Sequence, residues 1–208
     1  MPDGPKPASL KAFGINCSLK GGSKPSSTEA LMRQLFEELA KHDVEGEIVR
    51  AADHDINAGV SSDEGDGDAW PEFLTKVREA DILVIGSPIR LGQPSSIAKH
   101  VLERMHAFLN EKDSRGRMPS HGKVAICAIV GNEDGAHHGA AEILSALLEV
   151  GFTVPSGGST YWAGATDYKD FSTPPEAVAK WNAMLASNAA HLARLLKAAN
   201  YPGIRGER

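Results

Sequence analysis

Short apolar runs alternate along the chain with longer segments in which apolar residues recur every three or four positions. The short runs have the length of strands, and they lie at residues 10–16, 47–50, 81–86, 123–130 and 153–162. The longer segments have the period of helices, and they lie at residues 27–42, 70–78, 95–109, 139–150 and 174–199. This alternation predicts an α/β protein, in which a parallel sheet carries helices on both faces.

Segments that lack this periodicity indicate a surface loop and the limits of the domain. Residues 53–68 are rich in Asp, Gly, Ser and Asn, and we expect a long, mobile surface loop there. We also expect a disordered leader at residues 1–9, a single domain at residues 10–199 and a disordered tail at residues 200–208. No apolar run approaches the ~20 residues that cross a bilayer, so we expect no membrane span.

Charge and cysteine content narrow the function classes. The chain has 22 Lys and Arg residues against 27 Asp and Glu residues, for a formal net charge of −5, which argues against a nucleic-acid partner. Its two cysteines, Cys17 and Cys127, form no disulfide framework, which favours a reducing, cytoplasmic setting. No second residue makes Cys17 a catalytic pair, so we expect a structural role for it.

In open parallel sheets, ligands bind beyond the carboxyl ends of the strands, where the strand order reverses. The segments after the first, third and fourth predicted strands therefore form the candidate site. We call them the first loop (residues 16–28), the second loop (residues 86–96) and the third loop (residues 131–139).

The first loop combines hydroxyl groups, lysines and glycines, and it opens directly into a predicted helix. Helix N-terminal N–H groups attract anions, and hydroxyl groups add hydrogen bonds, so this loop predicts a phosphate site. The candidate residues are Ser18, Lys20, Ser26, Ser27 and Thr28. The alternative is that the last three only cap the helix. The loop matches neither the Walker pattern nor the dinucleotide fingerprint.

The second loop contains Pro88, which stiffens a turn, and Gly92, which allows a ligand to approach the backbone closely. Its backbone groups can therefore bind the edge of a flat heterocycle. The alternative is an ordinary connection in which Ser95 or Ser96 caps the next helix. On that helix, His100, Arg104 and His106 are most simply interpreted as a solvated or interface face.

The third loop is polar behind a fully apolar strand. Glu133, Asp134, His137 and His138 suggest a metal site, but their spacing fits no zinc pattern, so we expect no metal. Either histidine can act as an acid or base near neutral pH. The alternative is that one histidine caps the next helix or faces solvent.

Taken together, these residues resemble the flavodoxin-like NAD(P)H-dependent FMN reductases, a family that includes NAD(P)H:quinone oxidoreductases. The resemblance covers about residues 10–165. Ser18 with residues 26–28 is similar to the family's phosphate loop, and residues 86–104 are similar to its flavin-edge loop and following helix. The most specific match is residues 131–138, which resemble the third flavin loop of a bacterial subgroup that also has Tyr161, Trp162 and Gly164 at the corresponding positions.

The resemblance implies a three-layer αβα sandwich with a five-stranded parallel sheet in the order 2-1-3-4-5. It also implies FMN held noncovalently, with its phosphate on the first loop and its ring between the second and third. NADPH or NADH would reduce the flavin, and a quinone, free flavin or similar small molecule would accept the electrons. The implied flavin-binding residues are Ser18, Lys20, Ser26, Ser27, Thr28, Pro88, Ile89, Arg90, Leu91, Gly92, Gly131, Asn132, Glu133, Asp134, Gly135 and His138.

The cofactor supplies the reactivity in this chemistry, so no dedicated acid or base is required. Arg90, His137 and His138 remain weak catalytic candidates. A homo-oligomer, either a dimer or a tetramer, is expected from the resemblance, with the helix at residues 95–109 as a candidate surface.

The chain departs from the family at the second loop. An aromatic pair commonly follows the proline there, whereas this chain has Ile89, Arg90 and Leu91, which leaves the substrate side open. The cysteine cluster of iron–sulfur relatives is also absent. Two other functions stay open: a flavodoxin-type electron carrier that docks on protein partners, and a non-flavin phosphate-ligand binder.

Overall fold

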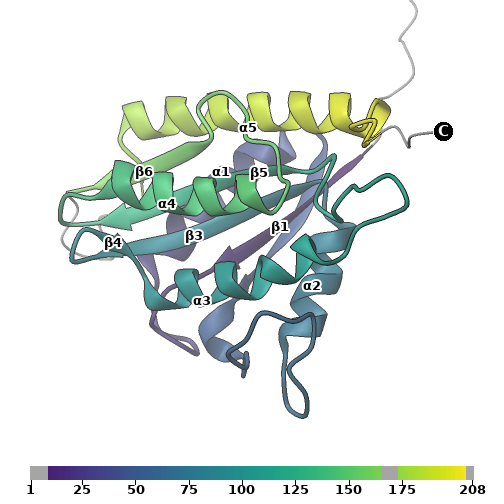
Figure 1. The fold of residues 1–208 in the computed structure, drawn as a ribbon. Coiled ribbons are helices and arrows are strands. Elements are labelled where there is room, and N and C mark those ends of the chain that lie inside the picture. The colour runs from purple at the N-terminus through teal and green to yellow at the C-terminus, as the bar shows by residue number, and fades with distance from the viewer. Residues whose placement is uncertain (1–8, 165–172, 205–208) are drawn as a thin grey trace, which may run out of the picture.

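The computed structural model describes residues 9–164 and 173–204. Five parallel strands form the sheet in the order β2-β1-β3-β5-β6, and a short sixth strand, β4, is paired antiparallel to β3 (Figure 1). The strands are β1 (Leu10–Asn16), β2 (Val44–Arg50), β3 (Ile82–Arg90), β4 (Gln93–Pro94), β5 (Val124–Gly131) and β6 (Ser159–Ala163).

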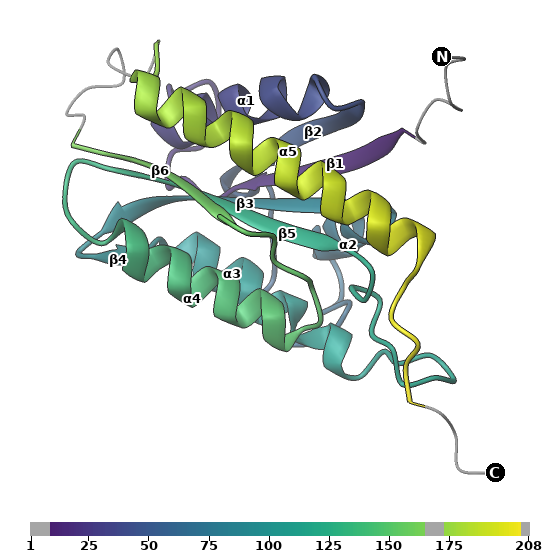
Figure 2. The same cartoon turned by 90° about the horizontal axis from the view of Figure 1, so that it is seen from above.

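Helices cover both faces of the sheet, as Figure 2 shows. The α-helices are α1 (Ser27–Ala40), α2 (Trp70–Glu79), α3 (Ser96–Arg104), α4 (Ala136–Glu149) and α5 (Glu176–Ala198). Short 3-10 turns, η1 (Ala51–Asp53) and η2 (Met105–Leu109), follow β2 and α3. One hydrophobic core lies between the sheet and α1 with α5, and the other lies between the sheet and α2, α3 and α4. The predicted three-layer sandwich and the order of its five parallel strands are confirmed.

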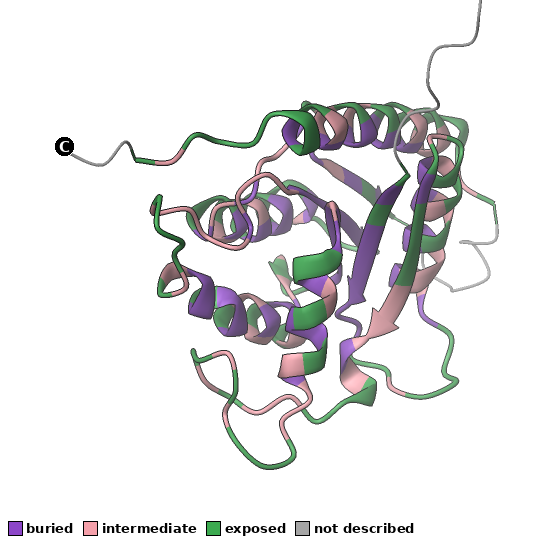
Figure 3. Cartoon of the chain, turned by 90° about the vertical axis from the view of Figure 1, so that its right-hand side faces the viewer, coloured by how far each residue is buried: buried purple, intermediate pink, exposed green. Residues whose placement is uncertain are grey.

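The central strand β3 is buried at every position from Ile82 to Ile89. Both faces of such a strand contact helices, which is why the sequence there is a continuous apolar run. Figure 3 shows the buried residues concentrated on the strands and on the inward sides of the helices. β3 continues four residues beyond the predicted strand, so Pro88, Ile89 and Arg90 are strand residues rather than loop residues.

Strand β4 follows a tight turn that the sequence pattern does not predict. Leu91 and Gly92 both have positive φ angles, 53° and 73°, and Arg90 pairs with Gln93 across them. Two central residues with positive φ are typical of a hairpin turn whose twist matches the flanking strands. The second loop is therefore a short hairpin, although leucine is an unusual residue in this conformation.

The predicted mobile loop at residues 53–68 is instead anchored to the protein. The Asp68 side chain is fully buried and accepts hydrogen bonds from the N–H groups of Asn57, Glu64 and Trp70. Arg104 lies 2.6 Å from Asp68 through Nη2 and is itself fully buried. The interpretation of Arg104 as part of a solvated or interface face is therefore wrong, because a helix residue facing a polar loop can be buried by forming an ion pair.

The chain ends show two different outcomes. Residues 1–8 of the expected leader and residues 205–208 of the expected tail lie outside the described residues. Residues 200–204, for which we expected disorder, contact the segment before β5: Ile204 N–H donates to the Arg115 carbonyl at 2.9 Å, and Tyr201 O accepts from Arg117. No helix in the described ranges is long and apolar enough to cross a membrane.

Candidate functional site

The three predicted loops meet at the carboxyl edge of the sheet. The Cys17 N–H donates to the Gly86 carbonyl at 2.8 Å, and the Ser95 hydroxyl donates to the Cys17 carbonyl at 2.6 Å, so the first and second loops are joined. The Leu91 N–H donates to Glu133 Oε1 at 3.2 Å, which joins the second and third loops. The loops therefore form one continuous rim.

The start of α1 has the features of an anion site. The hydroxyl of Ser26 accepts from the N–H of Glu29 at 3.2 Å and is the N-cap of the helix. In the described part of the chain, nothing accepts a hydrogen bond from the N–H groups of Ser27 and Thr28. The Ser27 hydroxyl is half-buried and also has no described partner. Two free N–H groups and a free hydroxyl at a helix start are suited to a phosphate.

The other predicted residues of the first loop have structural contacts. The Ser18 N–H donates to Asn16 Oδ1 at 3.0 Å, and the Ser18 hydroxyl donates to the Lys20 carbonyl at 3.4 Å. Lys20 Nζ lies 3.4 Å from the Pro25 carbonyl, across the loop. The Thr28 side chain is buried, with its methyl group close to Gly86. Ser18, Lys20 and Thr28 therefore shape the loop, whereas Ser27 is free to bind a ligand.

Arg50, at the end of β2, is a residue of the candidate site that the sequence reasoning missed. Its Nη1 donates to three carbonyl groups of the first loop, those of Lys20 (3.1 Å), Gly22 (2.6 Å) and Lys24 (3.0 Å). Its Nη2 forms an ion pair with Glu29. The available signal was its position: β2 lies beside β1, so its last residue comes to the same edge as the first loop.

The charge balance around the first loop is positive. A cavity of about 350 Å³ opens beside the loop, lined by residues 22–26 together with Glu29, Ala30, Arg33 and Arg50. Its lining includes three basic side chains, Lys24, Arg33 and Arg50, against the single carboxylate of Glu29. Desolvation raises the pKa of Glu29, but hydrogen bonds from Arg50 and Arg33 outweigh it and hold that pKa below its ordinary value. Glu29 is therefore an ion-paired carboxylate and does not repel an anion as a free charge.

Gly86 allows α1 to approach the sheet at the site. A methyl group added at Gly86 would lie 2.1 Å from the Sδ atom of Met32 and 3.0 Å from Cγ2 of Thr28. Any side chain would push away the first two turns of α1, which hold the free N–H groups.

The second loop is fixed by two serines. Ser95 N–H donates to the Ser87 hydroxyl at 2.9 Å, and the Ser95 hydroxyl caps α3 by accepting from the Ala98 N–H at 3.1 Å. Pro88 and Ile89 are buried, whereas Arg90 and Leu91 are exposed. Arg90 donates to its neighbour's carbonyl, that of Ile89, at 2.7 Å. The proposed capping role of Ser95 is thus correct, and it does not exclude a ligand at the hairpin tip.

The third loop is shorter than predicted, because α4 begins at Ala136 rather than at Gly139. Gly135 precedes the helix with a φ of 121°, and a methyl group there would lie 2.6 Å from the Gly92 carbonyl oxygen. Gly135 is therefore needed for the close approach of the second and third loops. Gly131 is buried against Ile89, and its carbonyl accepts from the Gly164 N–H at 2.8 Å.

Three polar residues of the third loop, Asn132, Glu133 and Asp134, are exposed at the rim. Asp134 Oδ1 accepts from the Gly135 N–H at 2.7 Å. Glu133 makes the contact with Leu91 described above. These residues are available to a ligand that approaches from solvent.

The weak catalytic candidates His137 and His138 lie on the first turn of α4, where they point to different neighbours. Nε2 of His138 lies 3.0 Å from Gln93 Oε1 and 2.9 Å from Glu142 Oε1, so this residue links α4 to the hairpin. The ring of His137 lies edge-on to Tyr161, with a centroid distance of 4.9 Å. The structure thus gives His138 a positioning contact and places His137 next to the sheet edge.

The two cysteines and the possible metal-ligating side chains are the remaining candidates for chemistry. Burial raises the pKa of the Cys17 thiol, and it raises the pKa of the Cys127 thiol to about 12, so both are neutral core residues. The structural role predicted for Cys17 is confirmed. In the described ranges, no three His, Cys, Asp or Glu side chains are grouped so that they could hold a metal ion.

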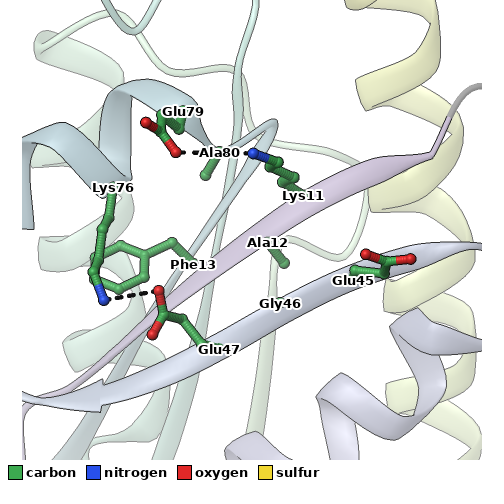
Figure 4. Close-up of a pocket in the computed structure, with 9 residues that line it drawn as sticks. All are labelled: Lys11, Ala12, Phe13, Glu45, Gly46, Glu47, Lys76, Glu79 and Ala80. Carbon is green, nitrogen blue, oxygen red and sulfur yellow. Dashed lines mark ion pairs between the residues drawn. The ribbon is translucent and has the colours of Figure 1, made fainter.

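A second cavity, of about 270 Å³, lies at the opposite end of β1 and β2 (Figure 4). Ion pairs cross it, between Lys76 and Glu47 at 2.8 Å and between Lys11 and Glu79 at 3.8 Å. Its lining carries two lysines against three glutamates, so it does not attract an anion, and it is far from the carboxyl edge where the three loops meet. It is therefore a weaker candidate than the rim.

Comparison with known proteins agrees with this geometry. The family model for NADPH-dependent FMN reductases matches residues 10–167. A curated relative, 8-demethyl-8-aminoriboflavin-5'-phosphate synthase from Streptomyces davaonensis, is 33% identical over 92% of this chain and 80% of its own length.

Solved structures give the same picture. The crystal structure of RosB with the bound intermediate 8-demethyl-8-formylriboflavin-5'-phosphate is 34% identical, has a TM-score of 0.83, and is aligned over 93% of this chain and 82% of RosB. The apo form of the NADH:FMN oxidoreductase EMOB is 19% identical, has a TM-score of 0.63, and is aligned over 90% of this chain and 89% of its own. This second likeness shows the shared fold.

Proposed function

Because this chain belongs to the NADPH-dependent FMN reductase family, we propose that it transfers electrons from NAD(P)H through FMN to a small acceptor such as a quinone or free flavin. Membership confirms the predicted family, the enzyme class of flavin-dependent oxidoreductase, and FMN with NAD(P)H as cofactor and reductant. The acceptor and the binding residues are the new part of the proposal. The cytoplasmic location, the oligomeric state and the absence of a nucleic-acid partner stay predictions.

The observation that supports the proposal most strongly is the start of α1. The N–H groups of Ser27 and Thr28 and the hydroxyl of Ser27 have no partner among the described residues. The neighbouring N-cap residue, Ser26, lines a cavity of about 350 Å³ that carries three basic side chains and one carboxylate. A doubly charged phosphate fits this donor set, because the helix dipole and the cations favour an anion there. We therefore assign the FMN phosphate to Ser26, Ser27 and Thr28, with Arg50 holding the loop in place.

The rim of the second and third loops is the proposed support for the flavin ring. Gly92 lacks a side chain and has open space beside its Cα, so a flat heterocycle can approach the backbone there, while Gly135 lets the two loops pack closely. Leu91 and Arg90 are exposed beside them, in place of the aromatic pair that is common in the family. FMN, when bound, supplies the hydride chemistry, and the residues of this chain bind it, orient it and limit which acceptor reaches it.

Steady-state oxidation of NADPH and NADH by the FMN-loaded protein tests this function. We expect quinone-dependent turnover well above the rate without quinone. A protein that binds FMN but shows no turnover with quinones or free flavin would be an electron carrier of the flavodoxin type. A protein that binds phosphate ligands and no flavin would contradict the proposal altogether.

A second candidate function is favoured by two of the relatives named above: one is a synthase of 8-demethyl-8-aminoriboflavin-5'-phosphate, and RosB binds the intermediate 8-demethyl-8-formylriboflavin-5'-phosphate. In that case a flavin 5'-phosphate is converted rather than used as a resident cofactor. Mass spectrometry of the flavin recovered after turnover separates the two, because a resident cofactor is recovered unchanged.

A further inference from the structure

A cavity of about 380 Å³ opens along the edge of the sheet at β6, beside the end of the third loop. Within the described residues, it is lined by His137, Ser159, Tyr161, Ala177, Val178 and Trp181, which come from α4, β6 and α5. Its volume lies in the range of small-molecule sites, roughly 300–1,000 Å³.

Two aromatic walls of this cavity are fixed by contacts of their own. The indole Nε1 of Trp181 donates to the Ser159 carbonyl at 2.7 Å, which sets the orientation of that ring. The Tyr161 ring packs against His137, with an interplanar angle of 73°. Both walls are therefore oriented before any ligand binds, which lowers the entropy cost of binding.

The aromatic surface is left open. Trp181 is 41% exposed and Tyr161 is 40% exposed, although aromatic residues of this size are usually buried or matched by a partner. By contrast, the other two tryptophans of the chain, Trp70 and Trp162, are buried. Open, oriented rings around a cavity are typical of a site that stacks a flat ligand.

The charge of the lining restricts the ligand. Among the described lining residues there is no Asp, Glu, Lys or Arg, and the polar groups are a hydroxyl on Ser159, a hydroxyl on Tyr161 and the ring nitrogens of His137. An anionic or cationic ligand would lose its hydration without gaining a counter-charge. A flat, uncharged molecule with one or two oxygen acceptors fits the lining.

We propose that this cavity binds a planar, uncharged aromatic molecule of one or two rings, stacked against Trp181 and Tyr161. Its position supports a role near the flavin, because His137 is two residues beyond Gly135 at the end of the third loop. Quinones have this chemistry. This step rests on the proposed function: when the protein transfers electrons to a quinone, the cavity is the site that binds this electron acceptor.

Calorimetric titration of the FMN-loaded protein with 2-methyl-1,4-naphthoquinone, in the absence of NAD(P)H, tests the binding site without turnover. We expect saturable binding of one quinone, which weakens about tenfold in Trp181→Ala and in Tyr161→Ala because each loses one stacking wall. Trp181→Phe, which keeps an aromatic wall, restores most of the affinity. Met184→Ala is the matched control: Met184 is on the same helix and is 42% exposed, but it does not line the cavity.

Kinetics then test the acceptor assignment. In Trp181→Ala we expect the KM for the quinone to rise by about the same factor, with kcat and the Kd for FMN unchanged. Equal quinone affinity in the wild type and in all variants overturns the binding site. Sedimentation experiments in which the cavity variants change self-association instead of quinone binding also overturn it. Weakened binding with an unchanged KM overturns the acceptor assignment alone. Absence of turnover in the wild type refutes the proposed function and leaves the calorimetric result to decide the binding site.

Discussion

Replacing Arg50 by methionine removes the guanidinium that joins the end of β2 to the first loop. The native side chain is 11% exposed, and it pairs with Glu29. Its Nη1 holds three loop carbonyls, those of Lys20, Gly22 and Lys24. Methionine fills a similar volume but makes none of these contacts, so the substitution isolates the polar function of Arg50.

The expected cost follows from those contacts. A hydrogen bond to a charged group contributes about 1.5–3 kcal/mol, but the three carbonyl groups belong to an exposed loop and can bind water once Arg50 is gone. Glu29 keeps Arg33 as a partner. We therefore expect the free energy of unfolding to fall by about 2 kcal/mol. If the loop must be ordered again when FMN binds, the same energy weakens FMN binding by about 30-fold.

Urea unfolding followed by circular dichroism measures the first quantity, and titration with FMN measures the second. Arg33→Met is the matched control for the unfolding measurement, because Arg33 also pairs with Glu29 but is 66% exposed and, among the described residues, contacts no loop carbonyl. We expect less than about 1 kcal/mol from the control. FMN affinity that is unchanged in Arg50→Met would refute the idea that Arg50 organises the phosphate loop.

The same variant has a predicted pH signature. The pKa of Glu29 is lower in the folded protein than its ordinary value, since the bonds from Arg50 and Arg33 outweigh desolvation. A group of this kind stabilises the fold above its unfolded pKa, about 4.3, and this contribution is lost as the pH falls through the folded pKa. The stability of the wild type should therefore fall more steeply in that acidic range than the stability of Arg50→Met.

Three other substitutions test the packing around the site. Gly86→Ala places a methyl group 2.1 Å from Met32 Sδ. We expect the free energy of unfolding, measured in urea, to fall by about 2 kcal/mol. An unchanged free energy of unfolding would contradict the close packing of α1 against the sheet. Asp68→Asn removes the nearer counter-charge of the buried Arg104 and leaves Glu64, whose Oε1 lies 3.4 Å from Arg104 Nη1. We expect about 2–3 kcal/mol of destabilisation and faster proteolysis of the 53–68 loop. A loss under about 1 kcal/mol would show that the ion pair with Asp68 is not the anchor. Leu91→Asn should stabilise the fold by about 0.5–1 kcal/mol in urea unfolding, because Leu91 is 92% exposed and has a φ of 53° that asparagine tolerates better. Destabilisation would show that the leucine side chain has a packing role.

The central strands are predictable from the sequence because both of their faces are covered. A strand such as β5 must be apolar at nearly every position, and its run of 8 buried residues from Val124 onward has the length of a strand rather than that of a helix. The hairpin at β4 is not predictable in this way. It depends on Leu91 in a conformation that leucine rarely adopts, and the sequence has no Asn-Gly or Asp-Gly signal there.

Polar burial is a second limit on sequence reasoning. Arg104 and Asp68 are 36 positions apart, and each looks like a surface residue within its own segment. Only the packing of the loop at residues 53–68 against α3 brings them together and makes burial of both charges possible. The apparent mobility of that loop is therefore a property of its composition and not of its contacts.

The candidate site is likewise predictable from the sequence in its position but not in the roles of its residues. The position of all three loops follows from the topology of parallel sheets, so the sequence locates the site. The roles within the first loop depend on contacts between elements: Ser26 is used as a cap, Thr28 packs near Gly86, and Arg50 arrives from β2. Sequence alone treats Ser26, Ser27 and Thr28 alike, whereas the structure uses Ser26 as the cap, buries Thr28, and leaves the half-buried Ser27 hydroxyl without a partner among the described residues.

Comparison of FMN with riboflavin tests most directly the claim that the start of α1 holds the flavin phosphate. The two ligands differ only by the phosphate group. For the wild type we predict that FMN binds at least about 100-fold more tightly than riboflavin, since two or more hydrogen bonds to a charged group are at stake. We also predict that Ser27→Ala weakens FMN binding and leaves riboflavin binding unchanged. Equal affinities for FMN and riboflavin, or equal losses of both ligands in Ser27→Ala, would contradict the phosphate site.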